Sequence, residues 1–265
     1  MHSIKHVLTV FLSFFLATNC HQKEKLTVPS RTVSPAIDIL DYESCSNLKT
    51  ALQNPSAVKY LTVDISSLYD YKALCSNLNS LQNLETIGVY SDLKVGGVEL
   101  VNSLERIGSL REVTLKGKFH NIFINLKNLK QIKELYLINN GVRRIPIDFL
   151  NDIPLETLSI REEDDYFLFY GELMPNTHLK IFEIYGYECE KMSNQIYSLD
   201  SLNELVITKS KIKIISDKIK SIKKLKRVVL RSTPFAEDKT RVTRLKKWLG
   251  DDCVVVTDVD VPFPD

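Results

Sequence analysis

The sequence is poor in the residues on which several functions depend. Its nine glycines form no Gly-rich loop of the kind that cradles phosphate groups. Its five cysteines include no Cys-x-x-Cys pair, so the usual spacing of a zinc or dithiol site is missing. Beyond residue 35 the histidines are His120 and His178, and neither adjoins a Ser or Cys in a nucleophile motif. These absences argue against an enzyme, and we expect no cofactor and no metal.

Leucine and its relatives, by contrast, recur at a regular spacing. The clearest segment starts at Ile132 and reads Ile-Lys-Glu-Leu-Tyr-Leu-Ile-Asn-Asn-Gly-Val, which is the L-x-x-L-x-L-x-x-N-x-L pattern of a leucine-rich repeat. Seven other segments fit the same frame, and successive starts are 22 to 26 residues apart. The other starts are Val58, Leu84, Leu110, Leu155, Leu179, Leu202 and Leu225.

In each segment the apolar residues first alternate, as in a β-strand, and then spread out, as in a helical return. One repeat cannot bury its own apolar edge, so neighbouring repeats must stack and share a core. We therefore predict an α/β fold, a right-handed solenoid (horseshoe) of about eight repeats over residues 58–232, with a parallel concave sheet. The ninth position, where an Asn side chain satisfies backbone groups of the turn, is Asn140 in the clearest repeat. At the same position, Lys118, Glu163 and Tyr187 predict looser turns.

The segments that flank the repeats are expected to cap the stack, because terminal repeats would otherwise expose apolar surface and open sheet edges. Residues 36–57 form the amino-terminal cap, with a short helix from Ser44 to Gln53. Residues 233–265 form the carboxyl-terminal cap, with a helix from Ala236 to Leu249 and a strand from Cys253 to Val256.

Residues 1–19 resemble a secretory signal peptide. The apolar run Val7–Ala17 has the length of a signal-peptide core and is too short to cross a bilayer. The segment Leu16–Cys20 resembles a bacterial lipobox, in which the Cys after the cut is lipid-modified, although Asn19 departs from the usual Gly, Ala or Ser. Two interpretations stay open: a lipoprotein anchored at Cys20 with residues 20–35 as a polar tether, and a soluble secreted protein cut nearby.

An exported chain can form disulfides, but four scattered cysteines do not fix a pairing. They are Cys45, Cys75, Cys189 and Cys253. A bridge between Cys45 and Cys75, which are predicted to lie close together, and small buried thiols both stay open.

The third, fifth and seventh positions of each repeat are predicted to point outward from the concave sheet. Tyr and Arg often dominate the energy of protein interfaces, although Tyr is also a good strand former. We predict that the concave face binds a protein partner. The predicted contact residues are Tyr60, Tyr90, Glu112, Tyr136, Ile138, Arg161, Ile181, Tyr185, Arg227 and Arg231.

Charge is nearly balanced in total, with 35 basic and 33 acidic residues, but it is unevenly distributed. Residues 201–250 hold 15 basic and 4 acidic residues, whereas residues 148–190 hold 11 acidic and 2 basic ones. The Lys-rich third is interpreted either as a binding surface for an anionic glycan or lipid headgroup, or as a solvated face that keeps the protein soluble. Nucleic acid is not expected as a partner of an exported protein.

Nearly the whole chain resembles bacterial leucine-rich-repeat lipoproteins, and two parts carry the likeness. The first runs from Ser46 to Val63 and continues with Leu81–Leu84; the second joins Thr233–Phe235 to Leu245–Leu249 and Cys253–Val256. The resemblance implies a protein-binding module that is secreted or held at the bacterial cell envelope, host-interacting in some cases, with membrane contact through the lipid anchor only. It implies no catalytic residues. A scaffold that stays in the periplasm is the remaining alternative.

Overall fold

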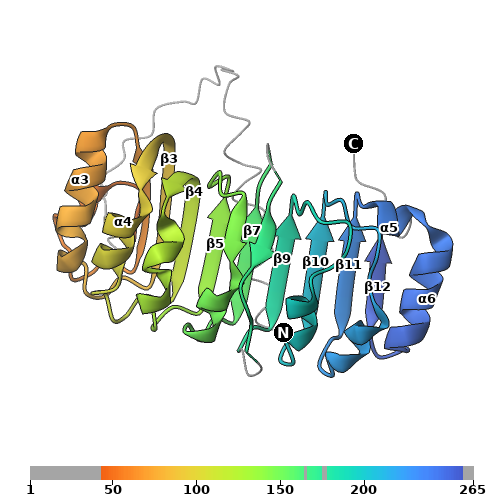
Figure 1. Cartoon of the computed structure of the whole chain (residues 1–265). Coiled ribbons are helices and arrows are strands. Elements are labelled where there is room, and N and C mark those ends of the chain that lie inside the picture. Colours follow the sequence, from red (N-terminus) through yellow and green to blue (C-terminus); the bar gives the residue numbers. More distant parts are fainter. Residues whose placement is uncertain (1–42, 164–165, 175–177, 259–265) are drawn as a thin grey trace, which may run out of the picture. The chain divides into compact units, whose positions relative to one another are not determined.

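The computed structural model describes residues 43–163, 166–174 and 178–258, which lie in the compact unit Asp41–Asp265. The predicted signal peptide, Cys20 and the tether fall outside the described residues. Within this unit, ten strands form one parallel sheet in the order β1-β2-β3-β4-β5-β7-β9-β10-β11-β12, and they stand side by side in chain order (Figure 1). None of the helices in the described ranges combines the length and apolarity that a bilayer crossing needs.

The strands of this sheet are short, apart from β3 and β4. Their bounds are β1 (Ser44–Cys45), β2 (Tyr60–Ile65), β3 (Thr86–Gly96), β4 (Glu112–His120), β5 (Glu134–Ile138), β7 (Thr157–Arg161), β9 (Ile181–Tyr185), β10 (Glu204–Thr208), β11 (Arg227–Arg231) and β12 (Val254–Thr257).

The repeats share one apolar core, as stacking requires. Leu84, Leu110 and Leu135 come from three successive repeats, have no solvent exposure, and belong to a single cluster that extends from Cys45 to Val255. Each predicted repeat contributes one strand to the parallel sheet. This arrangement fits a leucine-rich-repeat solenoid, as the sequence predicts.

Repeat length decides how the chain returns from one strand to the next. The repeats that start at Val58 and Leu84 are 26 residues long, and their returns hold the helices α3 (Leu68–Asn77) and α4 (Gly97–Leu104). The later repeats are 22 to 24 residues long and return through 3₁₀ turns, which advance about 2.0 Å per residue against 1.5 Å in an α-helix. Fewer residues therefore span the same distance. The 3₁₀ turns of the chain are η1 (Leu78–Ser80), η2 (Ile122–Ile124), η3 (Leu126–Asn128), η4 (Ile147–Asn151), η5 (Asn194–Ser198) and η6 (Asp217–Ser221).

The amino-terminal end of the sheet differs in detail from the sequence prediction. The expected helix from Ser44 is reduced to α2 (Leu48–Ala51), because β1 pairs with β2 as a strand. Asn47 ends the extended segment and caps α2, since its side-chain oxygen accepts a hydrogen bond from the Thr50 N–H at 2.8 Å.

The carboxyl-terminal end also differs, because the single predicted helix is two helices. They are α5 (Pro234–Glu237) and α6 (Lys239–Leu249), separated by the extended backbone of Asp238. The Asp238 carboxylate accepts a hydrogen bond from the Arg241 N–H at 3.1 Å and so caps α6. The last strand, β12, begins one residue later than predicted and pairs with β11.

All four cysteines of the described residues are free thiols. For Cys45 and Cys75 the structure therefore shows two buried thiols rather than a bridge. Burial raises the pKa of the Cys75 thiol to about 11, so this group stays protonated and unreactive at neutral pH.

A second, two-stranded parallel sheet forms in the return segments from β6 (Arg144–Pro146) and β8 (Leu168–Tyr170). Next to it, the rings of Phe167, Phe169, Phe182 and Tyr187 pack with centroids 5.3 to 5.8 Å apart. Tyr187, for which the repeat frame predicts a loose turn, is 2% exposed and fills this cluster.

Candidate partner-binding face

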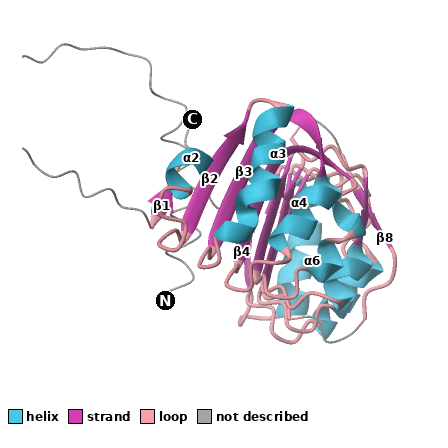
Figure 2. Cartoon of the chain, turned by 90° about the vertical axis from the view of Figure 1, so that its left-hand side faces the viewer, coloured by secondary structure: helices cyan, strands magenta, loops and turns pink. Residues whose placement is uncertain are grey.

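Figure 2 shows α3, α4 and α6 together on one face of the sheet. Along a strand such as β5, Leu135 and Leu137 are buried on the core side, so Tyr136 between them faces the other way. We call the surface formed by the third, fifth and seventh repeat positions of β2, β3, β4, β5, β7, β9, β10 and β11 the open face.

The open face consists of three straight rows, because the strands pair without a shift at these positions. The third-position row is Tyr60, Thr86, Glu112, Glu134, Thr157, Ile181, Glu204 and Arg227; the fifth is Thr62, Gly88, Thr114, Tyr136, Ser159, Glu183, Val206 and Val229; the seventh is Asp64, Tyr90, Lys116, Ile138, Arg161, Tyr185, Thr208 and Arg231. Each row agrees with the frame read from the sequence.

Exposure within the rows is uneven. Of the ten predicted contact residues, Tyr60 and Arg227 are exposed, and the other eight are half-buried by their neighbours. Gly88, Thr157 and Val229 stand in outward rows but are buried, so a position in an outward row is not always exposed to solvent. At Gly88 the cause is visible, because the Tyr90 hydroxyl oxygen lies 3.3 Å from where a Cβ would stand.

Tyr136 lies at the centre of the open face among carboxylates. Its hydroxyl donates a hydrogen bond to Glu134 Oε2 at 2.7 Å. Burial, followed by the nearby charges of Glu134, Glu112 and Glu183, raises the pKa of Tyr136 well above its ordinary value. The phenol therefore stays neutral, and it presents a half-buried aromatic ring with a committed hydroxyl group.

Glu183, which follows Ser159 in the fifth row, is a half-buried carboxylate. Desolvation and the charge of Glu204 raise its pKa above the ordinary value, although a hydrogen bond from Ser159 and the charges of Arg161 and Arg227 oppose the shift. Part of the free-energy cost of removing water from this carboxylate is therefore already present in the folded protein.

Replacing Glu183 by Gln is expected to change how stability depends on pH. A carboxyl group whose pKa is raised in the folded state binds its proton more tightly there, so stability falls as pH rises from the unfolded value, about 4.3, through the raised folded value. Glu183→Gln removes this fall. Urea unfolding at pH 4 and pH 7 should show the variant gaining stability relative to the parent at the higher pH. The exposed Glu172→Gln is the matched control, and an equal difference at both pH values would contradict the assignment.

Two cations lie over the ring of Tyr185, which stands in the seventh row. The guanidinium carbon of Arg161 lies 4.8 Å from the ring centroid, and the Lys209 ammonium lies 5.4 Å from it. Arg161 also pairs with Glu163 at 2.7 Å, and Lys209 Nζ donates to the Glu163 carbonyl oxygen at 2.9 Å. The ring is therefore fixed before any partner arrives, which lowers the entropy cost of binding.

Charge is divided across the strands as well as along the chain. The carboxylates of the open face gather in the third and fifth rows: Glu112, Glu134, Glu183 and Glu204. The cations gather mainly in the seventh row: Lys116, Arg161 and Arg231. Arg227 and Asp64 are the exceptions. The rows read from the sequence already contain this division, and the unshifted strand pairing makes it a continuous property of the open face.

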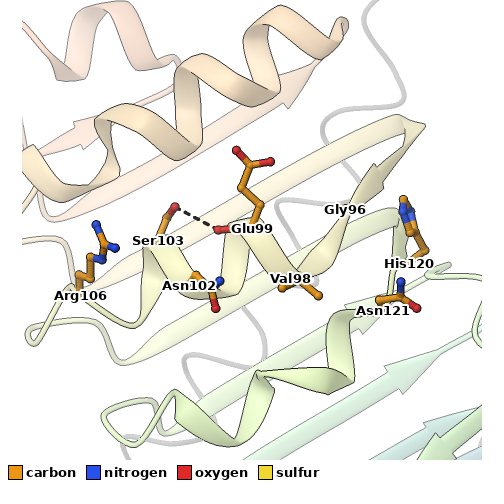
Figure 3. Close-up of a pocket in the computed structure, with 8 residues that line it drawn as sticks. All are labelled: Gly96, Val98, Glu99, Asn102, Ser103, Arg106, His120 and Asn121. Atoms are coloured by element: carbon orange, nitrogen blue, oxygen red, sulfur yellow. Dashed lines mark hydrogen bonds between the residues drawn. The ribbon is translucent and has the colours of Figure 1, made fainter.

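A hollow of about 500 Å³ lies on the other side of the sheet, along α4 (Figure 3). Arg106 stands at one end, and His120 and Asn121 stand at the other. Its one drawn hydrogen bond joins Ser103 Oγ to the Glu99 carbonyl oxygen at 3.1 Å, an ordinary contact within a helix. Within the described ranges, no group of three His, Cys, Asp or Glu side chains is placed to hold a metal ion.

This protein is similar to known proteins in structure but not detectably in sequence. No family model matches the chain, and no curated protein matches it significantly. Internalin C2 from Listeria monocytogenes matches with a TM-score of 0.46 and 17% identity, over 68% of this chain and 74% of that one. The ectodomain of the plant receptor kinase GASSHO1/SCHENGEN3 from Arabidopsis thaliana, solved in complex with CASPARIAN STRIP INTEGRITY FACTOR 2, gives 0.44 and 14%, over 71% of this chain and 26% of that one.

A leucine-rich-repeat protein of Leptospira interrogans, LIC12759, also matches, with a TM-score of 0.22 and 12% identity, over 79% of this chain and 98% of that one. All three are leucine-rich-repeat structures or bacterial internalins, but the TM-scores are low. The assignment of this chain to the leucine-rich-repeat fold therefore rests on its own strand pairing and repeated sequence.

Proposed function

We propose that this chain is an exported binding module that holds a protein partner on the open face. The observation that carries the proposal is the register of the three outward rows. It places one aromatic ring, Tyr136, in the carboxylate-rich rows and a second, Tyr185, in the cation-rich row beside them. Interfaces of this kind draw most of their energy from a few buried Tyr and Arg side chains, while flanking charges select and orient the partner.

The division of charge also describes the partner. A segment that lies along the rows, across the strands, would meet carboxylates on one side and cations on the other. We infer a partner surface with a basic edge and an acidic edge around an apolar or aromatic centre, because like charges at a desolvated contact are costly.

The place of action is part of the same proposal. We propose that the chain is exported and held at the bacterial cell envelope, by lipid modification of Cys20 or as a secreted product. Support comes from the apolar run Val7–Ala17 and the lipobox-like Leu16–Cys20. Protease treatment of intact cells separates a surface protein, which is digested, from a periplasmic scaffold, which is protected.

Photo-crosslinking tests where the partner sits. A photoreactive amino acid at position 185 should give a covalent adduct of higher mass in cells that make the protein, because Tyr185 stands in the seventh row. The same amino acid at position 214 serves as the control, since Ile214 is 51% exposed but lies in a return segment outside the ten-stranded sheet. Adducts from position 214 alone would place the partner elsewhere.

A further inference from the structure

A second surface stands apart from the open face, on the carboxyl-terminal helix α6. Its residues Lys239, Arg244 and Lys247 fall within an arc of roughly 140° around the helix axis, on the side away from the core. The opposite side carries Leu245, which is fully buried, with Val242 and Leu249 packed against the core. The amphipathic pattern therefore fixes α6 on the protein and turns its cations outward.

These cations line a hollow. It measures about 630 Å³ and is bounded by Lys239, Thr240, Thr243, Arg244, Lys247 and Trp248. The indole of Trp248 is half-buried, since it packs partly against the core and partly borders the hollow. Three cationic side chains, two hydroxyl-bearing side chains and the Trp248 indole therefore border one open hollow on the side of α6. All of them can donate hydrogen bonds to phosphate oxygens.

The cations of this α6 surface are not paired with carboxylates of the described residues. In the part of the chain that the structure describes, no carboxylate pairs with Lys239, Arg244 or Lys247, whereas Arg241 pairs with Asp238 at 2.9 Å. Residues 218–249 contain twelve basic and two acidic residues. The turn η6, against which α6 packs, adds Lys218. An anionic partner would therefore gain charge contacts without displacing existing ion pairs.

We propose that α6 docks on an anionic membrane surface, with lipid phosphate groups in the hollow and Trp248 at the water–lipid boundary. Trp is the side chain that best suits that boundary, because its large apolar body and its polar N–H favour opposite sides of it. Lys and Arg stems cover apolar surface while their charged ends reach the headgroups. A sulfated glycan would use the cations but gives the indole no comparable role. This contact is separate from the proposed lipid anchor at Cys20, and it is independent of the open face.

The chain offers a built-in reporter, because Trp248 is its single tryptophan. The full chain is mixed with vesicles of phosphatidylcholine alone, or with about 30% phosphatidylglycerol added, each with and without brominated acyl chains. Docking should shift Trp248 emission to shorter wavelength and allow quenching by the brominated lipid only on the anionic vesicles. Attachment through the amino-terminal segment alone would leave this emission unchanged, whatever the vesicle. In about 0.5 M salt, where charges are screened beyond ~4 Å, the shift should disappear.

Matched variants distinguish the effect of the α6 cations from the effect of the protein's net charge. Lys239→Gln, Arg244→Gln and Lys247→Gln together should raise the anionic lipid needed for a half-maximal shift on the order of 100-fold, since each cation near such a surface contributes about fivefold. Gln keeps the helix propensity of the residues it replaces. Lys49→Gln, Lys72→Gln and Lys127→Gln remove the same charge from exposed positions and should change little. An unchanged emission on anionic vesicles, an equal response to neutral vesicles, or a response to heparin fragments but not to vesicles would each overturn the proposal.

Discussion

Replacing Gly117 by Ala is expected to destabilise the protein by about 4 kcal/mol, a large part of the roughly 5–15 kcal/mol that holds a typical domain together. Gly117 lies in β4 with φ +118°, a backbone conformation that L side chains rarely adopt. A Cβ at this position would stand 1.8 Å from the carbonyl oxygen of Ser91 on the neighbouring strand. Neither backbone can move away easily, because both strands belong to the shared sheet. Urea unfolding followed by circular dichroism measures the loss.

Two other glycines distinguish the effect of backbone strain from the effect of the steric clash. Gly141 also has a positive φ, +69°, but only Lys118 Cγ, at 3.9 Å, lies near its missing Cβ. Gly141→Ala should therefore cost about 1–2 kcal/mol from backbone strain alone. Gly108 has no atom within 4 Å of that position, and Gly108→Ala should lie within about 0.5 kcal/mol of the parent. A Gly117→Ala variant as stable as Gly108→Ala would show that β3 and β4 do not approach as described.

The second large effect is expected at Asn140, the ninth residue of the clearest repeat. The two hydrogens of its side-chain Nδ2 are shared among the carbonyl oxygens of Leu115, Gly117 and Ile138, at 3.0, 2.9 and 2.9 Å. Asn140 is 4% exposed, so water cannot easily reach these carbonyl oxygens when the side chain is removed. Since each unsatisfied buried polar group costs about 1–3 kcal/mol, Asn140→Leu should lose about 3 kcal/mol or more.

Ser210 occupies the same repeat position with a weaker set of contacts and provides the control. Its hydroxyl donates to the Thr208 carbonyl oxygen at 3.1 Å and accepts from the Tyr187 N–H at 3.4 Å. Ser210→Ala should cost about 1 kcal/mol, roughly one ordinary hydrogen bond. Unfolding in urea ranks the two variants, and equal losses would mean that the Asn140 side chain does not join its own repeat to the preceding one.

The sequence was sufficient for the stacked architecture and the strand register. Apolar residues alternate within each strand, and the strands recur every 22 to 26 residues. Only stacked, unshifted strands bury all of these apolar residues together. Contacts between repeats were not predictable in the same way. Glu162 is an example, because it stands one position before the frame's ninth residue. Its carboxylate accepts hydrogen bonds from the Asn140 and Gly141 N–H groups of the preceding repeat, at 2.9 and 3.2 Å.

The candidate site shows the same limit. The outward rows followed from the repeat frame, and the residues chosen for them stand where the frame places them. The cations around the Tyr185 ring were not predicted together, because Lys209 lies 24 residues further along and one position beyond the seventh row. The interruption of the predicted helix at Asp238 was missed as well. Apolar spacing does not show whether an Asp side chain will cap a new helix at its own position.

Three substitutions made together test whether the open face holds the partner: Tyr90→Thr, Tyr136→Thr and Tyr185→Thr. Thr suits a strand, so the melting temperature should change little, while capture of the crosslinked partner should fall at least about tenfold. Tyr69→Ala, Ile124→Thr and Ile214→Thr remove exposed apolar side chains outside the sheet and should leave capture intact. Undiminished capture by a folded open-face variant would contradict the account.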